Sequence, residues 1–566
     1  MNWLEKHRDR FELAQQACEQ RHCWSAFPEM PGKYPDAEAA QASGMARHHA
    51  QLGQAFALDQ PGKIGELGQE ISPYTQCELG IKYPQANVDV LFTSAEQAMP
   101  SWAAAAIDTR IGVLMEVLDT IYREHMFEVV HAVMHTAGQS FNMAYAGSGV
   151  NALDRGIEAL VYAHRAMTDV TPRARWERRF GSSQIVLDKN YRLIPRGVAV
   201  CFACASFPTW NAWPSMMASL ATGNPVIVKP HPATILPMAI TVRVFRQVLT
   251  AAGFDPNLVT LALDTPQEPI GKILVKHPKT AIVDFTGSVR FGQWVEENAY
   301  PALCFTETAG CNTVVLESSD DLDAALRSLA TTICMFSAQM CTSPQNIYVP
   351  ASGVKTPSGR VSFDEVGRRL AEAVAALTAE PHKAAMILAT IQSEQTVTLL
   401  SHLEQAFEAD QDASTDILLR SKPYPHPEFP AARTRTPLML KVSKQQRDIY
   451  GQEQFGPISF VIACDDAEDA LQQATNDVKQ FGGLTAFLYS TCEEYIAQAE
   501  AAYAKAGAQL TINLTGAMPL NFAAAYSDYH VTGLNPAGNA ALTQMAFVAS
   551  RFCIAQSRRP ALAAST

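Results

Sequence analysis

One cysteine, Cys341, lies among small and polar residues just before a strand-like run, in FSAQMCTSPQNIYVP (336–350). A cysteine taken at random is most often a small buried residue without a chemical role. A cysteine can also be a nucleophile, which then needs a base, donors for an oxyanion and an acceptor for the electrons of an oxidation. The residues elsewhere in the chain decide between these two interpretations.

Glu307 is the candidate base. It lies in FTETAGCN (305–312), among apolar and small residues, 34 positions before Cys341. Such surroundings suit a carboxylate to general-base catalysis. The alternative interpretation is a surface carboxylate at the end of a strand.

Two motifs predict a dinucleotide site. In LATGNPVIVKPHPAT (220–234), Lys229 ends a buried strand, where open α/β sheets bind ligands, and His231 adds a hydrogen-bond donor. In VDFTGSVRFG (283–292), Gly287 and Ser288 stand between a strand and a helix start, where backbone N–H groups can hold a phosphate. Each motif alone also has an ordinary structural explanation, a solvated strand end or a simple turn.

Composition excludes several other classes. The net charge of −12, without a stripe of Lys and Arg, argues against a nucleic-acid partner. The charged start of the chain lacks the apolar core of a signal peptide, and the most apolar stretch, 197–228, is interrupted by polar residues and Pro. The twelve cysteines show no disulfide spacing, and the CxxC of Cys201 and Cys204 has no second pair to complete a metal site. We therefore expect a cytoplasmic protein with no metal and no membrane contact.

The elements around these motifs predict an α/β fold. Residues before about 170 are mainly helical, and RIGVLMEVLDTIYREHMFEVVHAVMHTAG (110–138) predicts one amphipathic helix that ends at a glycine. From about 195, short β-branched runs alternate with helices, which is typical of a parallel sheet covered on both faces. The charged, alternating segment 173–195 predicts a β-hairpin that leaves the body of its domain and pairs with another subunit near 542–553.

Together these motifs resemble the aldehyde dehydrogenase superfamily, over about residues 100–555. The spacing of Glu307 and Cys341 is that of the family's ELGGK glutamate and its catalytic cysteine, and SAQMCTSPQNIYV is similar to the cysteine motif. YGQEQFGPISFV (450–461) resembles the family's EEIFGPV motif, which implies that Glu453 and Phe455 bind the nicotinamide ribose region. The long N-terminal extension and the ending NFAAAYSDYHVTGLNPAGNA (521–540) look most like the PaaN-type proteins of bacterial phenylacetate degradation.

The resemblance implies a Rossmann-type cofactor domain, an α/β catalytic domain, an oligomerisation arm and a homodimer or homotetramer. The expected division is 1–172 as the helical part of the cofactor domain with an extension atypical of the family, 173–195 as the oligomerisation hairpin, 196–307 as the dinucleotide-binding domain, 308–515 as the catalytic domain, and 516–566 as the return to the cofactor domain with a C-terminal oligomerisation segment.

Two departures from the family pattern affect the site. The family's oxyanion-binding Asn falls, by counting back from Lys229, on Ser206, whereas Asn211 lies five residues later; both are candidate donors together with the Cys341 backbone N–H. The Glu that NAD-preferring members carry three residues after the lysine is Pro232 here, so a 2′-phosphate meets no repulsion from it and NADP is expected to serve at least as well as NAD.

The predicted function is NAD(P)-dependent oxidation of an aldehyde to a carboxylic acid in aromatic catabolism. Cys341 attacks the aldehyde, hydride passes to the nicotinamide, and Glu307 activates the water that hydrolyses the thioester. Two alternatives stay open at this point. One is a CoA-acylating aldehyde dehydrogenase, and the other is a catalytically idle protein that keeps the fold.

Overall fold

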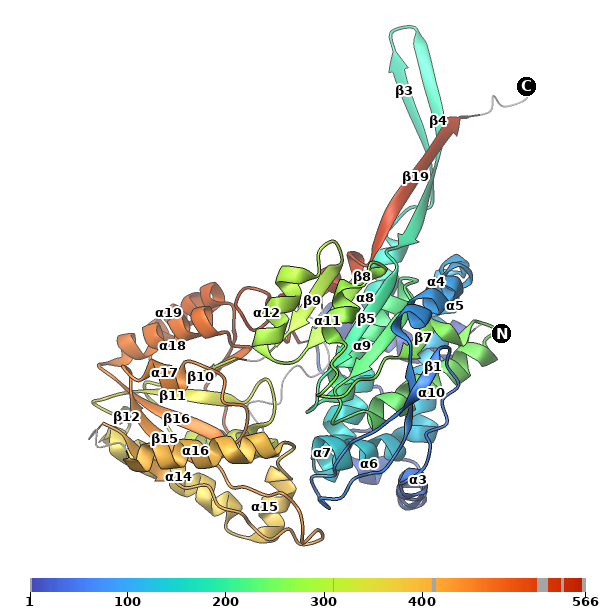
Figure 1. The fold of residues 1–566 in the computed structure, drawn as a ribbon. Coiled ribbons are helices and arrows are strands. Elements are labelled where there is room, and N and C mark those ends of the chain that lie inside the picture. Colours follow the sequence, from blue (N-terminus) through green and yellow to red (C-terminus); the bar gives the residue numbers. More distant parts are fainter. Residues whose placement is uncertain (1–2, 309, 410–413, 517–527, 541–543, 562–566) are drawn as a thin grey trace.

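The computed structural model describes residues 3–308, 310–409, 414–516, 528–540 and 544–561 (Figure 1). Two α/β sheets and a long β arm organise the chain. The first sheet has five parallel strands in the order β7-β6-β5-β8-β9. Its strands are β5 (Val198–Ala203), β6 (Val226–Pro230), β7 (Val259–Leu261), β8 (Thr280–Thr286) and β9 (Leu303–Glu307).

This sheet is buried on both faces, as a parallel sheet requires. Alternate residues of each strand belong to different cores: Ala199 and Cys201 pack on one side, Val198 and Val200 on the other. The first side is covered by α9 (Pro208–Ala221) and α10 (Leu236–Ala251). The second is covered by α4 (Val88–Ala104), α11 (Gly271–Lys276) and α12 (Val289–Asn298).

The second sheet has seven strands in the order β14-β15-β16-β11-β10-β17-β18, all parallel except β14. The strands are β10 (Asn312–Leu316), β11 (Pro344–Pro350), β14 (Asp416–Leu419), β15 (Leu438–Ser443), β16 (Ile458–Cys464), β17 (Thr485–Tyr489) and β18 (Gln509–Ile512). One face carries α13 (Leu322–Cys334), α14 (Phe363–Thr378) and α15 (Pro381–Leu388). The other carries α16 (Glu394–Ala409), α18 (Ala467–Phe481) and α19 (Glu493–Ala506). The α/β fold class is confirmed.

The N-terminal part is helical apart from a two-stranded sheet of β1 (Lys63–Leu67) and β2 (Tyr83–Ala86). Its helices are α1 (Trp3–Lys6), α2 (Arg8–Gln20), α3 (Ala37–Gln51), α5 (Ile107–Thr120), α6 (Met126–Ala137), α7 (Phe141–Tyr145) and α8 (Ala152–Thr168). The helix predicted over 110–138 is confirmed as a continuous helical stretch up to Ala137, but Ile121–His125 forms a π-helical turn that divides it into α5 and α6. Such a turn changes the phase of the apolar face. The helix does end at Gly138, whose φ of 83° lies in the left-handed region.

A three-stranded antiparallel arm projects from the body (Figure 1). It is formed by β3 (Arg173–Phe180), β4 (Ser183–Pro195) and β19 (Phe552–Pro560), with β4 in the middle. The prediction that the C-terminal strand joins the hairpin across a subunit boundary is wrong, since β19 pairs along β4 of the same chain. Residues 542–543 of that predicted segment lie outside the described residues.

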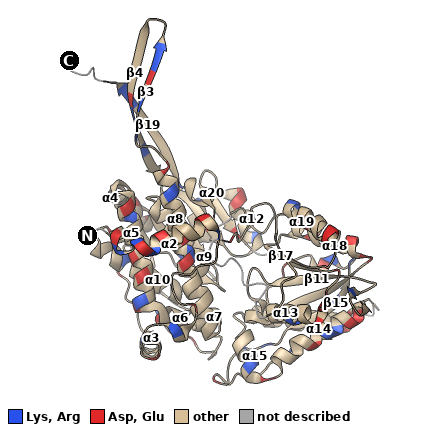
Figure 2. Cartoon of the chain, turned by 180° about the vertical axis from the view of Figure 1, so that it is seen from behind, with Lys and Arg blue, Asp and Glu red and all other residues tan. Residues whose placement is uncertain are grey.

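Charge is distributed differently over the arm and the body. Lys and Arg recur along β3, β4 and β19 with a few acidic residues between them, and residues of both signs are interspersed over the helices of the body (Figure 2). Charged side chains on the outer strands of a small sheet limit indiscriminate pairing with other strands. Among the described residues, no helix is both long and apolar enough to cross a membrane.

Candidate active site

Glu307 and Cys341 come from different sheets. Glu307 is the last residue of β9, and it is 2 % exposed. Cys341 follows the short η5 helix (Met335–Ala338), in which Phe336, Ser337 and Ala338 all have positive φ values. Left-handed backbone at three successive non-glycine residues is costly, and such strain is characteristic of functional sites.

Asn312, at the start of β10, holds the cysteine loop in place. Its amide nitrogen donates to the carbonyl oxygens of Cys341 and Ser343, both at 2.8 Å. Its amide oxygen accepts the backbone N–H groups of Leu484 and Thr485 at 2.9 and 3.1 Å. One side chain therefore fixes the cysteine loop to the strand and to the turn before β17.

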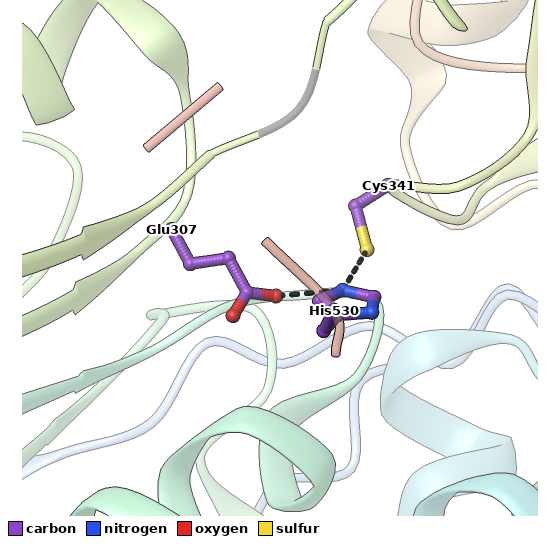
Figure 3. A group of neighbouring side chains, drawn as sticks. All are labelled: Glu307, Cys341 and His530. Carbon is purple, nitrogen blue, oxygen red and sulfur yellow. Dashed lines mark hydrogen bonds and ion pairs between the residues drawn. The ribbon is translucent and has the colours of Figure 1, made fainter. Parts of the chain in front are cut away.

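A histidine joins the two candidate catalytic groups. The Nε2 atom of His530 lies 2.9 Å from Glu307 Oε1 and 3.4 Å from Cys341 Sγ (Figure 3). The donor atoms of the three residues all lie within 4.8 Å of one another. A transition-metal ion could also be bound by such a set, but hydrogen bonds already pair the three groups with one another.

The segment that carries His530 is fixed against both sheets. Thr308 donates its backbone N–H to Ala537 O at 2.7 Å, and Glu307 forms a β-bridge with Gly538. A Cβ at Gly538 would lie 2.4 Å from Thr306 O, and its φ is 142°, so this close approach requires glycine. Asn535 donates to Gly483 O at 2.8 Å, which ties the same segment to the second sheet.

Of the two predicted oxyanion donors, the structure brings Asn211 to the catalytic group and not Ser206. Asn211, in the first turn of α9, donates its Nδ2–H to Glu307 Oε1 at 2.8 Å. The Ser206 side chain hydrogen-bonds the Cys204 thiol instead, and its carbonyl accepts from Gln139 Nε2 at 2.6 Å. The contact with the candidate base is therefore made by Asn211, in the first turn of α9, and not by Ser206, in the connection between β5 and α9.

The environment of Cys341 opposes a negative charge on its sulfur. Burial raises the pKa of the thiol well above its ordinary value, and the negative groups of Glu307, Cys204 and Glu453 raise it further. The residue's own backbone N–H acts in the other direction. Burial likewise raises the pKa of Glu453 to about 7. Formation of the thiolate therefore needs hydrogen-bond donors or positive charge nearby.

A single large cavity of about 1160 Å³ reaches from Cys341 and His530 to the carboxyl ends of β5, β6 and β8. All the predicted cofactor residues line it: Lys229, His231, Gly287, Ser288, Glu453 and Phe455. Its size exceeds the range of about 300–1,000 Å³ that is common for small-ligand pockets.

The residues at the sheet edge fit a dinucleotide. Ser288 is the N-cap of α12, and its hydroxyl accepts the N–H of Phe291 at 3.4 Å, which leaves the first helical N–H groups at the cavity. A Cβ at Gly287 would lie 2.7 Å from the Phe285 ring, so this position requires glycine. Because glycine has no side chain, the backbone there is open to a close ligand. His231 is tied to its own turn, since its Nδ1 accepts the N–H of Ala233 at 3.2 Å.

An acidic side chain that sequence analysis did not identify lies beside the lysine. Lys229 Nζ forms an ion pair with Asp264 Oδ1 at 2.7 Å, and both side chains line the cavity. Burial lowers the pKa of Lys229, with the carboxylate of Asp264 acting against that change. A carboxylate from the loop after β7 therefore lies beside the lysine, and the prediction of NADP use from Pro232 did not include this negative charge.

Sequence reasoning missed three further residues of the site, His530, Asn312 and Asp264. His530 lies in the stretch 521–540, the part that does not match the family's usual ending, and residues 517–527 are outside the described residues. Only the unusual ending itself was a signal that this stretch does something different here. Asn312 is the last residue of the motif that contains Glu307, and Asp264 lies in the loop after β7. Ordinary polar residues at strand ends carry no specific signal.

A thiol close to a carboxylate, together with a cavity that fits a dinucleotide, is typical of a cofactor-dependent oxidoreductase that forms a covalent intermediate. The family profile described as the aldehyde dehydrogenase family matches residues 66–521. The chain therefore belongs to the aldehyde dehydrogenase family, and its activity is the NAD(P)-dependent oxidation of an aldehyde.

Individual relatives agree with this assignment. A crystal structure of an NAD-dependent aldehyde dehydrogenase from Burkholderia multivorans is 42% identical in sequence, with a TM-score of 0.95 and 100% of both chains covered. The 1-pyrroline-5-carboxylate dehydrogenase 2 of Bacillus subtilis is 24% identical over 454 residues, which are 77% of this chain and 80% of that protein. Lactaldehyde dehydrogenase of Escherichia coli is 25% identical over 413 residues, 70% of this chain and 76% of that protein.

Proposed function

We propose that this enzyme oxidises an apolar, aromatic-type aldehyde to its carboxylic acid, with water as the acyl acceptor and NAD as the preferred cofactor. The observation that carries the proposal is the approach of Glu307 and Cys341, whose donor atoms lie within 4.8 Å of each other and share His530. A base so close to the nucleophile is suited to activating a water at a thioester.

Cys341 supplies the nucleophile. Its sulfur attacks the aldehyde carbon, and the oxyanion that forms accepts hydrogen bonds from the Cys341 backbone N–H and from Asn211 Nδ2–H. Asn211 now donates to Glu307, so it exchanges one acceptor for the other during the reaction. Removing one oxyanion donor in other enzymes costs roughly 3 kcal/mol of transition-state stabilisation. We infer that Asn211 rather than Ser206 fills this role.

When bound, the nicotinamide supplies the acceptor for the hydride that leaves the aldehyde carbon. What remains on Cys341 is a thioester, and Glu307 takes a proton from the water that hydrolyses it. Its Oε2 atom has no hydrogen-bond partner among the described residues, so one carboxylate oxygen is available for that proton. Glu453 and Phe455 line the same cavity and are proposed to hold the nicotinamide ribose region.

The cavity wall supports an apolar substrate. Met143, Phe207 and Trp210 line the part near Cys341, and Phe207 packs edge-on against Phe336 at a centroid distance of 5.6 Å. Flat apolar walls with one reactive group favour an aromatic or arylalkyl aldehyde. This lining, together with the resemblance to PaaN-type proteins, supports a role in phenylacetate catabolism.

Location and assembly are part of the same proposal. All twelve cysteines are free thiols, which supports a reducing, cytoplasmic location. The arm of β3, β4 and β19 exposes two strand edges away from the body, which supports a homodimer or homotetramer formed through the arm. Light scattering at micromolar concentration tests the assembly, and a monomer there would overturn it.

The function is tested by stopped-flow measurement of reduced cofactor with a panel of aldehydes, with and without CoA. Cys341→Ala is expected to fold and to lose all turnover. Glu307→Gln is expected to keep a burst of one equivalent of reduced cofactor and to lose steady turnover, since acylation survives and deacylation does not. Turnover in Cys341→Ala, or steady turnover that depends on CoA in the wild type, would contradict the proposal.

A further inference from the structure

His530 is the feature of the site that the proposed reaction does not yet use. It is 2 % exposed, and its Nδ1 atom has no hydrogen-bond partner among the described residues. The polar contacts of the ring are therefore made by Nε2, toward Glu307 and Cys341 (Figure 3). A buried side chain directed in this way at both reacting groups has more than a packing role.

The proton position follows from the chemistry of the partners. An ionised carboxylate accepts hydrogen bonds and cannot donate one, so a contact of 2.9 Å between Glu307 Oε1 and Nε2 places a hydrogen on Nε2. The same N–H faces Cys341 Sγ at 3.4 Å, within the range of a hydrogen bond to sulfur. One donor thus lies between two acceptors.

Two further side chains hold and polarise the ring. His530 packs edge-on against Trp210, with centroids 4.6 Å apart, and the Arg155 guanidinium lies 4.2 Å from the centre of the Trp210 ring. Arg155 is buried, and three of its nitrogens have no hydrogen-bond partner among the described residues. Its charge interacts favourably with Glu158 and, after it, with Glu307 and Cys341, so a buried positive charge lies on the far side of the Trp210 ring.

We propose that His530 is a catalytic residue that stabilises the Cys341 thiolate before any cofactor binds. In the resting enzyme its Nε2–H donates a hydrogen bond to the Glu307 carboxylate. When the thiol ionises, the S–H bond breaks and the proton passes to solvent water in the cavity, without any change in oxidation state. The thiolate is a stronger acceptor than the thiol, so the Nε2–H, which lies between the two groups, turns toward the sulfur. Glu307 keeps its charge and serves as the base for deacylation.

This role explains how the thiolate forms in a site that otherwise opposes it. Burial first, and then Glu307, Cys204 and Glu453, disfavour a negative charge on the sulfur. His530 supplies a fixed donor in direct contact with the sulfur, and Arg155 adds a buried positive charge behind it. The deacylation part rests on the proposed function, whereas the effect on the thiol does not.

The test is the rate of Cys341 alkylation by iodoacetamide between pH 6 and 10, without aldehyde or cofactor, followed by peptide mass spectrometry. His530→Phe keeps a ring against Trp210 and removes the donor. We expect its apparent Cys341 pKa to rise by at least one unit and its alkylation rate at pH 7 to fall tenfold or more. His530→Gln, which retains an N–H donor, should recover most of the wild-type rate.

Cys492 is an exposed thiol in the same protein and is the internal control, because its alkylation should be equal in all variants. An unchanged pH profile of Cys341 in folded His530→Phe would overturn the proposal. Should that variant not fold, His530→Leu, which also lacks a donor, is measured in the same way, with the same two outcomes. The alkylation assay contains no aldehyde and does not depend on turnover. Absence of dehydrogenase activity would therefore refute the proposed function, but the effect of His530 on the Cys341 thiol would still stand.

Discussion

The ion pair at the carboxyl end of β6 predicts which dinucleotide the enzyme prefers. Lys229 Nζ lies 2.7 Å from Asp264 Oδ1, and both line the proposed cofactor cavity. With the carboxylate present, NAD should be preferred, since a 2′-phosphate beside the lysine would be repelled. Asp264→Asn removes the charge and keeps the size of the side chain. We expect it to raise the ratio of kcat/KM for NADP to that for NAD at least tenfold.

The magnitude follows from the geometry of the pair. A phosphate oxygen bound to Lys229 on the side away from Asp264 would lie roughly 5.5 Å from the carboxylate, where two unit charges repel by about 3 kcal/mol at an effective dielectric of 20. In bulk water the same repulsion is about 0.8 kcal/mol. Because a phosphate carries about 1.5 to 2 negative charges, even the bulk-water repulsion comes to about 1.2–1.6 kcal/mol, which is roughly tenfold in an equilibrium constant.

The assay measures steady-state kinetics with both dinucleotides and one aldehyde, together with calorimetric binding of each dinucleotide. Glu268→Gln is the matched control, because Glu268 is an exposed carboxylate in the same loop and does not line the cavity. The control should leave the ratio unchanged. A wild type that prefers NADP tenfold, or an Asp264→Asn variant with the wild-type ratio, would refute the reasoning.

Two further predictions concern stability. Burial lowers the pKa of His48 to about 3 and those of its neighbours His131 and His135 to about 4, from 6.5, so the unfolded chain binds more protons as the pH falls. The contribution of these neutral rings to the free energy of unfolding is complete above pH 6.5. It is lost as the pH falls toward 4, at up to about 1.4 kcal/mol per pH unit for each ring. The Tm of His48→Phe, which keeps the ring stack, should fall less than that of the wild type between pH 6.5 and 5; parallel curves would contradict this. Arg551 pairs with buried Asp284 at 2.5 and 2.8 Å, and Arg551→Met should lower the free energy of unfolding in urea by about 3–5 kcal/mol. A loss below about 1 kcal/mol would show that the pair is not needed.

The sequence alone determined the fold class and the family. Short β-branched apolar runs alternate with helices in the chain, and this pattern depends on local residue types that can be seen without coordinates. Glu307 and Cys341 were found for a related reason, since each lies in a recognisable motif beside its strand. The predicted cofactor residues likewise lie at strand ends or helix starts, and all of them line one cavity.

The tertiary structure decided which side chains from segments far apart in the sequence contact one another. His530 reaches Cys341 across 189 positions of the chain, and Asn211 reaches Glu307 across 96, so no local pattern contains either contact. Asp264 reaches Lys229 from a loop after another strand, and β19 returns to β4 of its own chain rather than to a second subunit. Residue types and spacing determine which elements form. The donors and charges that tune the site depend on how these elements pack, because hydrogen bonds and Coulomb interactions act through space and not along the chain.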